Sequence, residues 1–260
     1  MKKLLTWGQV LSLALVMTPK YSVAKQVKAA TRDTASIAST IKDEPLSLSE
    51  MQREIRLEHA HELLGKYYKK SAVRAGESVK KINSQIYAWV KEKLPKKYKP
   101  QYKKIAKTII EESMKHEFDP VFLLSVIQNE SSFNPSMLGS LDEIGLMQLR
   151  PGTAEWIANK FEIKYKGAKS LHDPVANIRI GAAYMDYLRD RLPHAQLYLS
   201  AYNMGKRNVD KNIEENIWPK EYAGHVMRYY IEFYEAIKVD QPRGKHKMKV
   251  ASLKQASDRS

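Results

Sequence analysis

Hydrophobic residues recur at helical spacing along most of this chain. From about residue 101 onward, apolar side chains stand three or four positions apart, as in Ile105, Ile109, Ile110 and Met114, which is the period of an amphipathic helix. No segment alternates apolar and polar residues in the manner of a strand. The pattern therefore predicts an all-α fold, which becomes α+β at most through a small hairpin between residues 133 and 149.

One predicted helix has almost no polar face. Asp119-Pro120 supplies an N-cap residue and a proline for the first turn, and residues 121–127 are almost entirely apolar. A helix that is hydrophobic all round is buried, so this helix should run through the middle of the domain and end at Asn134-Pro135. Asp173-Pro174 gives the same start signal for a later helix.

The chain divides into segments of different composition. Ser47-Leu48-Ser49-Glu50 has the form of a capping box, and it opens a predicted helical N-terminal extension over residues 47–100. Residues 25–46 are rich in Lys, Ala, Ser and Thr without a helical period, which indicates a linker. A helical domain over residues 101–238 is expected to hold the chemistry. Residues 239–260 are basic and lack core material, which predicts a disordered tail.

The first 24 residues have the composition of an export signal. Lys2 and Lys3 precede an apolar run over residues 4–17, and Ser22-Val23-Ala24 provides small residues for cleavage after about Ala24. The run is shorter than the ~20 apolar residues of a membrane-spanning helix, although an uncleaved anchor is the alternative. We expect an exported protein, periplasmic or secreted. Because the chain has no Cys, a lipoprotein anchor, disulfides and thiol catalysis are excluded.

Net charge narrows the range of partners. The formal charge is +15 at pH 7, and a basic surface attracts polyanions such as nucleic acid, anionic lipid or an anionic cell wall. Export makes nucleic acid the least suitable, so we expect peripheral association with a wall or membrane surface through the basic segments. Composition does not separate wall from lipid and leaves the oligomeric state open.

His59-x-His61 and His116-Glu117 lack the spacing of metal ligands on one helix face, and we predict no metal site.

Glu130 is the acidic residue whose sequence context most strongly suggests a catalytic role. It follows the apolar helix, where burial would disfavour the charged carboxylate and raise its pKa, as a general acid near neutral pH requires. A solvated glutamate at a helix C-terminus is the plain alternative. Gly145-Leu146-Met147-Gln148 and Ala201-Tyr202-Asn203 are weak signals singly, because such residues also occur in ordinary loops and helix ends. In this order and spacing the three features form a stronger signal.

Together these motifs resemble the catalytic domain of the soluble-type lytic transglycosylases. That family has a lysozyme-like, mostly helical fold related to the goose-type lysozymes. The similarity covers residues 103–234. Further positions that match are Asn134-Pro135, Pro151-Gly152-Thr153-Ala154, Asn177-Ile178 with Gly181, and Tyr222 before Val226.

The resemblance implies a role for each matching position. Glu130 corresponds to the family's single catalytic acid/base, and Ser131 to the serine beside it, for which a structural role is expected. The other matches are expected to bind or orient substrate. They are Met147 and Gln148 along the sugar subsites, Tyr202 orienting the carboxyl group, Asn203 behind that tyrosine, and Tyr222 from a late helix.

The reaction that the resemblance implies cleaves the β-1,4 bond between N-acetylmuramic acid and N-acetylglucosamine in peptidoglycan glycan strands. Protonated Glu130 gives its proton to the linking oxygen. Its carboxylate then takes a proton from the muramic acid C6 hydroxyl, which closes on C1 as a 1,6-anhydro ring. One carboxylate therefore suffices where most glycosidases use two, and neither a metal nor a cofactor is implied.

The loop after Glu130 departs from the family pattern. A serine commonly stands nine residues after the acid, where this chain has Gly139 followed by Ser140, and Asp142 and Glu143 replace small residues. The acidic pair allows three interpretations: a solvated loop, a second acid that activates water as in a goose-type-lysozyme-like hydrolase, or a contact with a cationic, de-N-acetylated sugar. A non-catalytic wall-binding or secretion scaffold is a further alternative, against which the retained glutamate argues.

Overall fold

The computed structural model describes residues 46–75 and 77–239, and these residues belong to one compact unit that begins at Leu46. The expected signal peptide over residues 1–24, and almost all of the expected linker and basic tail, lie outside the described residues. Within the described ranges, no helix combines the length and the apolar composition needed to cross a membrane.

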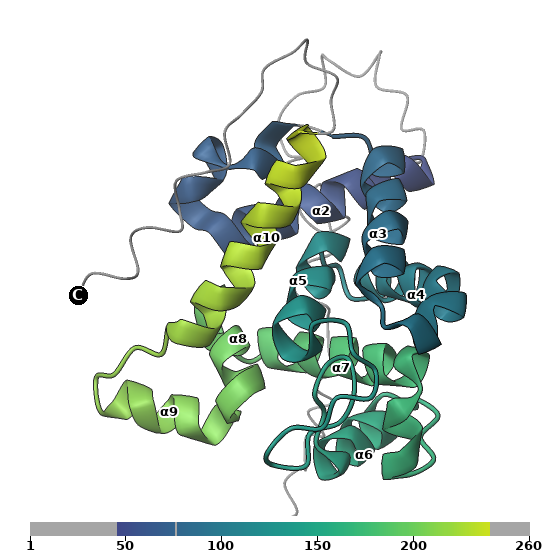
Figure 1. Cartoon of the computed structure of the whole chain (residues 1–260). Coiled ribbons are helices and arrows are strands. Elements are labelled where there is room, and N and C mark those ends of the chain that lie inside the picture. The colour runs from purple at the N-terminus through teal and green to yellow at the C-terminus, as the bar shows by residue number, and fades with distance from the viewer. Residues whose placement is uncertain (1–45, 76, 240–260) are drawn as a thin grey trace, which may run out of the picture. The chain divides into compact units, whose positions relative to one another are not determined.

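Helices dominate the part of the chain that the structure describes (Figure 1). The α-helices are α2 (Leu48–Leu64), α3 (Val79–Lys93), α4 (Tyr102–Lys115), α5 (Pro120–Ser131), α6 (Pro151–Lys160), α7 (Pro174–Arg189), α8 (Ala195–Met204), α9 (Lys206–Glu214) and α10 (Glu221–Val239). Short 3-10 helices cover Gly65–Lys70, Ala72–Ala75, Lys96–Gln101 and Ala168–His172. The all-α prediction is confirmed.

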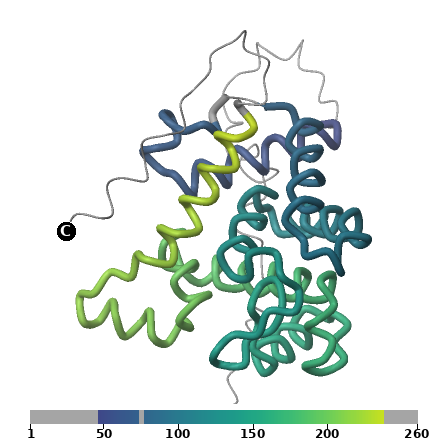
Figure 2. The backbone as a smooth tube through the Cα atoms, viewed as in Figure 1, coloured from purple at the N-terminus to yellow at the C-terminus, as the bar shows by residue number. Residues whose placement is uncertain are grey.

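The predicted hairpin is reduced to isolated β-bridges. Ile144 forms one antiparallel bridge with Leu138 and another with Leu149. Both bridges lie in the long irregular loop between α5 and α6, whose path can be followed in Figure 2. The predicted location of the hairpin was therefore right, but the pairing is too short to make a strand.

Helix α5 lies in the middle of the unit, with α10 on one side and α3 and α4 on the other (Figure 1). Its side chains over residues 121–127 are fully buried, as the sequence pattern predicts. The carboxylate of Asp119 caps the helix by accepting the Val121 N–H at 2.9 Å. The helix ends at Ser131, before the predicted stop at residues 134–135, because Ser132 and Phe133 adopt left-handed backbone conformations with φ of 48° and 64°.

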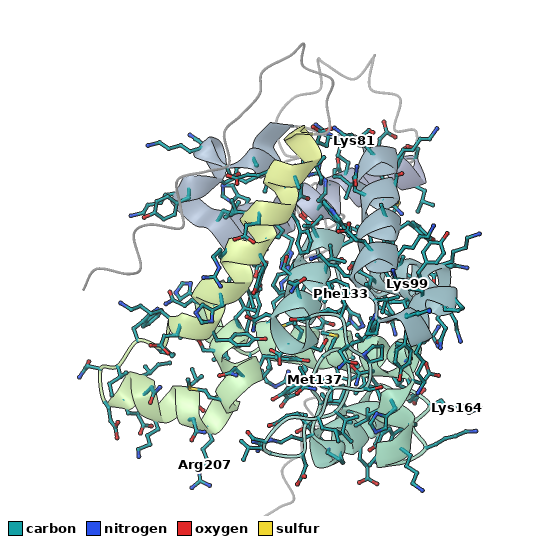
Figure 3. All side chains as sticks on the ribbon, in the orientation of Figure 1. Lys81, Lys99, Phe133, Met137, Lys164 and Arg207 are labelled. Atoms are coloured by element: carbon teal, nitrogen blue, oxygen red, sulfur yellow. The ribbon has the colours of Figure 1, made fainter. Side chains whose placement is uncertain are left out.

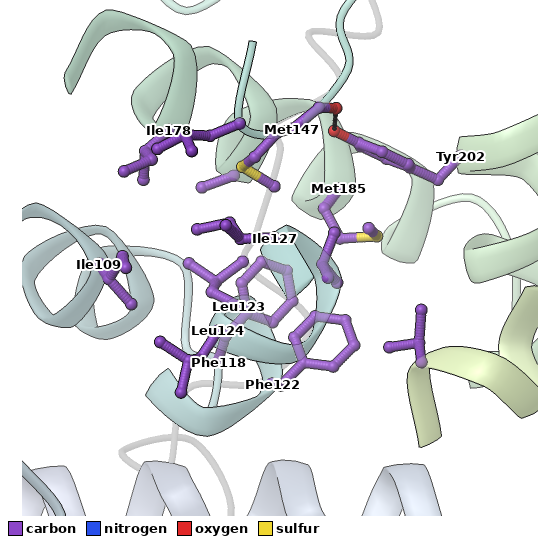
Figure 4. Close-up of a cluster of buried hydrophobic side chains, with 14 of the residues drawn as sticks. Ile109, Phe118, Phe122, Leu123, Leu124, Ile127, Met147, Ile178, Met185 and Tyr202 are labelled. Atoms are coloured by element: carbon purple, nitrogen blue, oxygen red, sulfur yellow. Dashed lines mark hydrogen bonds between the residues drawn. The ribbon is translucent and has the colours of Figure 1, made fainter. Parts of the chain in front are cut away.

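The hydrophobic core joins the N-terminal helices to the helices that follow. Side chains from α4, α5, α7 and the loop after α5 meet in Figure 4; they include Ile109, Leu123, Ile127, Met147, Ile178 and Met185, all with 0 % exposure. Helix α3 adds Ile82, Ile86 and Val90 and packs along α4. The helices within residues 47–100 therefore share their core with the domain that carries Glu130.

The carboxylate of Asp119 is the centre of a buried polar network. Tyr230 and Tyr234 of α10 each donate a hydroxyl hydrogen bond of 2.6 Å to its Oδ2 atom. Arg56 of α2 donates to the Tyr234 hydroxyl at 3.3 Å. Burial raises the pKa of Asp119, and the positive charge of Arg56 and the two tyrosine hydroxyls oppose this rise. One carboxylate thus connects α2, α5 and α10.

His59 on α2 provides a second link to the same residue. Its Nδ1 atom accepts the backbone N–H of Asp119 at 3.0 Å, and its Nε2 atom lies 3.2 Å from the Tyr198 hydroxyl. Because Nδ1 accepts a hydrogen bond, the neutral ring carries its proton on Nε2 and donates to Tyr198. Burial and the positive charge of Arg189 hold the pKa of His59 well below its usual value, so the ring is neutral at pH 7.

Replacing Asp119 with Ala should lower the free energy of unfolding by more than about 3 kcal/mol, because it removes a helix cap and leaves two buried hydroxyls without their acceptor. Asp173→Ala is the matched control, since Asp173 caps α7 through the Val175 N–H at 2.9 Å but is exposed. Its loss should be about 1 kcal/mol. Urea denaturation followed by circular dichroism measures both, and equal losses would contradict the role given to the tyrosine hydroxyls.

Candidate active site

Glu130 lies in the last turn of α5, next to Ser131, and is partly buried. Tyr222 on α10 donates its hydroxyl hydrogen bond to Oε1 of Glu130. This contact brings α10 against the end of α5 at the carboxyl group. Figure 3 labels Phe133 and Met137 in the loop that leaves this end of the helix.

The carboxyl group has a raised pKa. Burial is the largest influence and raises the pKa of Glu130 to about 7. Hydrogen bonds with Tyr222 and Asn129 lower this pKa, and the negative charge of Glu143 raises it. Near neutral pH the protonated and ionised forms are therefore both well populated, which suits a group that first donates and then accepts a proton.

Glu130 opens into a cleft of about 650 Å³. One wall is formed by loop residues between Gly139 and Arg150, and the other by the junction of α8 and α9, from Tyr202 to Asn208. The predicted site residues that line the cleft are Glu130, Ser140, Glu143, Gln148, Tyr202 and Asn203. The structure therefore brings together segments that are far apart in sequence, as the resemblance implies.

Asn177 of α7 holds the Gly-Leu-Met-Gln loop in place. Its side-chain oxygen accepts the Met147 N–H at 2.8 Å, and its amide nitrogen donates to the carbonyls of Ile144 and Leu171 at 2.8 and 3.0 Å. Gly145 is needed here, because its φ is 82° and a Cβ atom would lie 2.5 Å from the Asn177 amide nitrogen. The buried amide of Asn177 thus satisfies two backbone groups of this loop and one of the 3-10 helix Ala168–His172.

Met147 does not line the cleft with its side chain, contrary to the expectation. It is fully buried in the core (Figure 4), and its sulfur occupies the space beside Gly181. A Cβ atom on Gly181 would lie 2.4 Å from that sulfur, so the glycine makes room for the methionine. The contribution of Met147 to the site is its backbone carbonyl.

The hydroxyl that contacts the carboxyl group belongs to Tyr222 and not, as expected, to Tyr202. Tyr202 donates its single hydroxyl proton to the carbonyl of Met147 at 2.8 Å (Figure 4). It is thereby fixed as a wall of the cleft, with its ring 5.2 Å from that of Tyr184. Asn203 is exposed on the same wall and does not lie behind the tyrosine.

Ser131 and Gln148 hold the loop rather than only facing the cleft. The buried Ser131 hydroxyl has one proton to share between two carbonyls, that of Leu146 at 2.9 Å and that of Ile127 at 3.2 Å. Gln148 lines the cleft, and its amide nitrogen donates to the Gly145 carbonyl at 3.0 Å. Ser140 is exposed at the cleft wall.

The two loop acids have different positions. Asp142 is exposed, has a φ of 63° and is not among the residues that line the cleft. Glu143 does line it, but both of its oxygens are bound: Oε2 accepts the Leu141 N–H at 2.9 Å, and Oε1 accepts Nε of Arg150 at 3.0 Å. Burial raises the pKa of Glu143, but the Leu141 N–H and Arg150 outweigh it and bring this pKa below its usual value.

Gly139 lies close to the side-chain ends of Glu143 and Gln148. A Cβ atom at that position would lie 2.4 Å from Oε2 of Glu143 and 2.8 Å from Oε1 of Gln148. A serine at this position would therefore displace the ends of these two side chains from the positions they have here.

Sequence reasoning missed several residues of the site. Tyr184, Thr153 and Arg150 line the cleft; Tyr184 and Arg150 stand in no motif noted in the sequence, and Thr153 was noted only as a matching position. Asn177 was noted only as a matching position, although a buried amide with three backbone partners is recognisable once the loop is in place. Within the described part of the chain, no group of three or more His, Asp or Glu side chains could hold a metal ion.

Comparison with known families agrees with this geometry. Residues 107–223 match the family model of the transglycosylase SLT domain. A little under half of this chain is therefore similar to the SLT domain. The matched segment contains the cleft residues of both walls and Tyr222, and it leaves out α2, α3 and most of α10.

The relatives of the SLT domain are longer proteins. The chain is 30% identical over 125 residues to the soluble lytic murein transglycosylase of Salmonella typhimurium, covering 47% of this chain and 18% of the relative. It is 27% identical over 165 residues to the Escherichia coli K12 protein of the same name, covering 63% and 23%. The structure of an inactive mutant of the lytic transglycosylase Slt from Pseudomonas aeruginosa has 25% identity and a TM-score of 0.47, covering 52% and 25%. The chain thus spans a quarter or less of these relatives.

Tyr222→Phe should raise the pKa of Glu130 above its value of about 7, because the hydrogen bond from Tyr222 stabilises the ionised form. The carboxyl group would then stay protonated to higher pH. Carbon-13 NMR of labelled glutamate side chains, with Glu130→Gln to assign the signal, measures this titration. Tyr184→Phe is the matched control at the same cleft and should leave the pKa of Glu130 unchanged. An unchanged pKa in Tyr222→Phe would count against the hydrogen bond.

Proposed function

We propose that this protein is a peptidoglycan lytic transglycosylase that cleaves the MurNAc–GlcNAc β-1,4 bond and leaves a 1,6-anhydroMurNAc end. The observation that carries the proposal is Glu130, a partly buried acid whose pKa is raised to about 7, at the base of a cleft large enough for several sugar rings. The names of the relatives support the same activity.

Glu130 serves both proton transfers. In its protonated form it donates a proton to the oxygen between the two sugars as the C1–O bond breaks toward an oxocarbenium-like state. The resulting carboxylate accepts the proton of the muramic acid C6 hydroxyl, whose oxygen bonds to C1. No water is consumed, and Glu130 ends in the form in which it began.

Tyr222 is the positioning residue for this carboxyl group. Its hydroxyl binds Oε1, and it stabilises the carboxylate that forms after the first proton transfer. The polar groups of Gln148, Asn203 and Thr153 lie along the cleft walls and are suited to hydrogen bonds with sugar hydroxyl and acetamido groups.

The hydrolase alternative has less support. A second acid that activates water needs a free carboxylate facing the sugar. Glu143 uses both oxygens within the loop, and Asp142 is not among the cleft residues. The same contacts disfavour a cationic sugar, because the Arg150 guanidinium already neutralises Glu143. A non-catalytic scaffold would not account for the raised pKa of Glu130.

The substrate that fits this proposal is the glycan strand of the cell wall, which an exported protein would reach. Export depends on the leader predicted for residues 1–24, and a basic protein would be held near an anionic wall. We propose residues 101–238 as the catalytic domain, with residues 47–100 as a helical extension that completes its core.

Digestion of purified peptidoglycan by the full chain should release muropeptides with 1,6-anhydro ends, detected by mass spectrometry. Glu130→Gln should lower the rate at least ~10³-fold, since amide for acid removes both proton transfers. Glu143→Gln is the matched control, and its products should keep the anhydro ends.

The product masses separate the alternatives. Reducing ends that carry one added water would establish a hydrolase, and loss of those ends in Glu143→Gln would identify the second acid. Release from de-N-acetylated wall only would favour the cationic-sugar interpretation. If the wild-type chain releases nothing from either wall, the catalytic proposal fails.

A further inference from the structure

A second cavity lies outside the cleft and partly outside the segment that matches the SLT family. It measures about 280 Å³ and is formed by α3, α5 and α10, the three helices that stand side by side in Figure 1. Its lining residues are Trp89, Glu92, Lys93, Gln128, Tyr229, Glu232, Phe233 and Ala236. We propose that this cavity is a second carbohydrate site, which binds a neutral N-acetylated sugar unit of the glycan strand.

The aromatic side chains suit the apolar face of a sugar ring. Trp89 of α3 and Phe233 of α10 pack with ring centroids 4.8 Å apart, and Tyr229 lines the same cavity one turn earlier on α10. Trp89 and Tyr229 are only partly buried. Aromatic rings combine a large apolar face with a polar edge, which is the combination that a pyranose ring with its C–H face and hydroxyls requires.

The polar side chains around these rings suit hydroxyl and acetamido groups. Gln128 offers an amide with both donor and acceptor atoms, and Glu92 and Glu232 offer carboxylate acceptors. The cavity volume of about 280 Å³ is close to the ~300 Å³ at which small-ligand sites begin, and the lining mixes aromatic rings with polar side chains. The volume therefore fits a sugar unit rather than a protein segment.

The nearby charges favour a neutral ligand over a cationic one. Lys93 places its ammonium group 5.5 Å from the centre of the Phe233 ring, and Arg228 lies 3.9 Å from Glu232. These cations balance the two carboxylates at the rim. The rim therefore has no net negative charge to attract a free amine, and an N-acetylated sugar, which is uncharged, needs none.

The cavity shares two helices with the catalytic carboxyl group. Gln128 and Glu130 both lie in the last turns of α5, and Tyr229 stands two turns beyond Tyr222 on α10. A sugar bound there would hold the wall close to the cleft without occupying it. The choice of this polymer as ligand rests on the proposed function.

The test is NMR of the full chain labelled with nitrogen-15 tryptophan, in the Glu130→Gln form so that no substrate is cleaved. The chain has four tryptophans, and Trp89→Phe identifies the Trp89 indole signal. Titration with a tetramer of β-1,4-linked N-acetylglucosamine should move this signal saturably and leave that of Trp156, which lies on α6 against Tyr187, in place.

Tyr229→Ala should weaken the binding reported by Trp89 about ten-fold, which corresponds to ~1.4 kcal/mol. Tyr67→Ala, at an exposed tyrosine outside both cavities, should not change it. A Trp89 signal that stays still at millimolar tetramer, or that moves only with the tetramer of unacetylated glucosamine, would overturn the proposal. Because binding is read without turnover, failure of the catalytic proposal would appear in the product assay and not here.

Discussion

The buried carboxylate of Asp119 is the contact on which the active-site geometry depends. It caps the helix that carries Glu130, and it accepts the hydroxyls of Tyr230 and Tyr234 from the helix that carries Tyr222. Burying a carboxylate costs free energy unless its acceptor sites are filled, and here they are filled by groups from both helices. The relative placement of α5 and α10, and with it the contact between Glu130 and Tyr222, is therefore fixed from within the core.

Desolvation raises the pKa of both Asp119 and Glu130, but the two carboxyl groups have different surroundings. Asp119 is enclosed by its three hydrogen-bond partners, whereas Glu130, whose pKa is raised to about 7, opens into the cleft. Asn177 and Ser131 satisfy the backbone of the loop opposite, so the cleft wall does not depend on the substrate for its shape. Rigid walls and one poorly compensated acid are what a general acid requires.

The sequence alone predicted the features that depend on the local pattern of residues. Asp119-Pro120 and the apolar run after it predicted α5, and the position of Glu130 beyond that run predicted a shielded acid. Predictions that depend on packing between helices were wrong. Met147 was placed in the cleft because its burial against Gly181 is a contact between distant segments. Tyr202 was predicted to contact the carboxyl group of Glu130, but Tyr222 makes that contact. Which tyrosine reaches Glu130 depends on where α10 packs against α5. The stop of α5 was misplaced because two non-glycine residues adopt left-handed conformations.

The hydrogen bonds of Asp119 also join segments that lie far apart in the sequence. Its backbone N–H meets a histidine 60 residues earlier, and its carboxylate meets a tyrosine 115 residues later. A chain emerging from the ribosome therefore leaves this carboxylate without its tyrosine partners until α10 has been synthesised. Contacts between residues so far apart form slowly because long loops must close first. The hydrogen-bond network around Asp119 can therefore be completed only after residue 234 has been made.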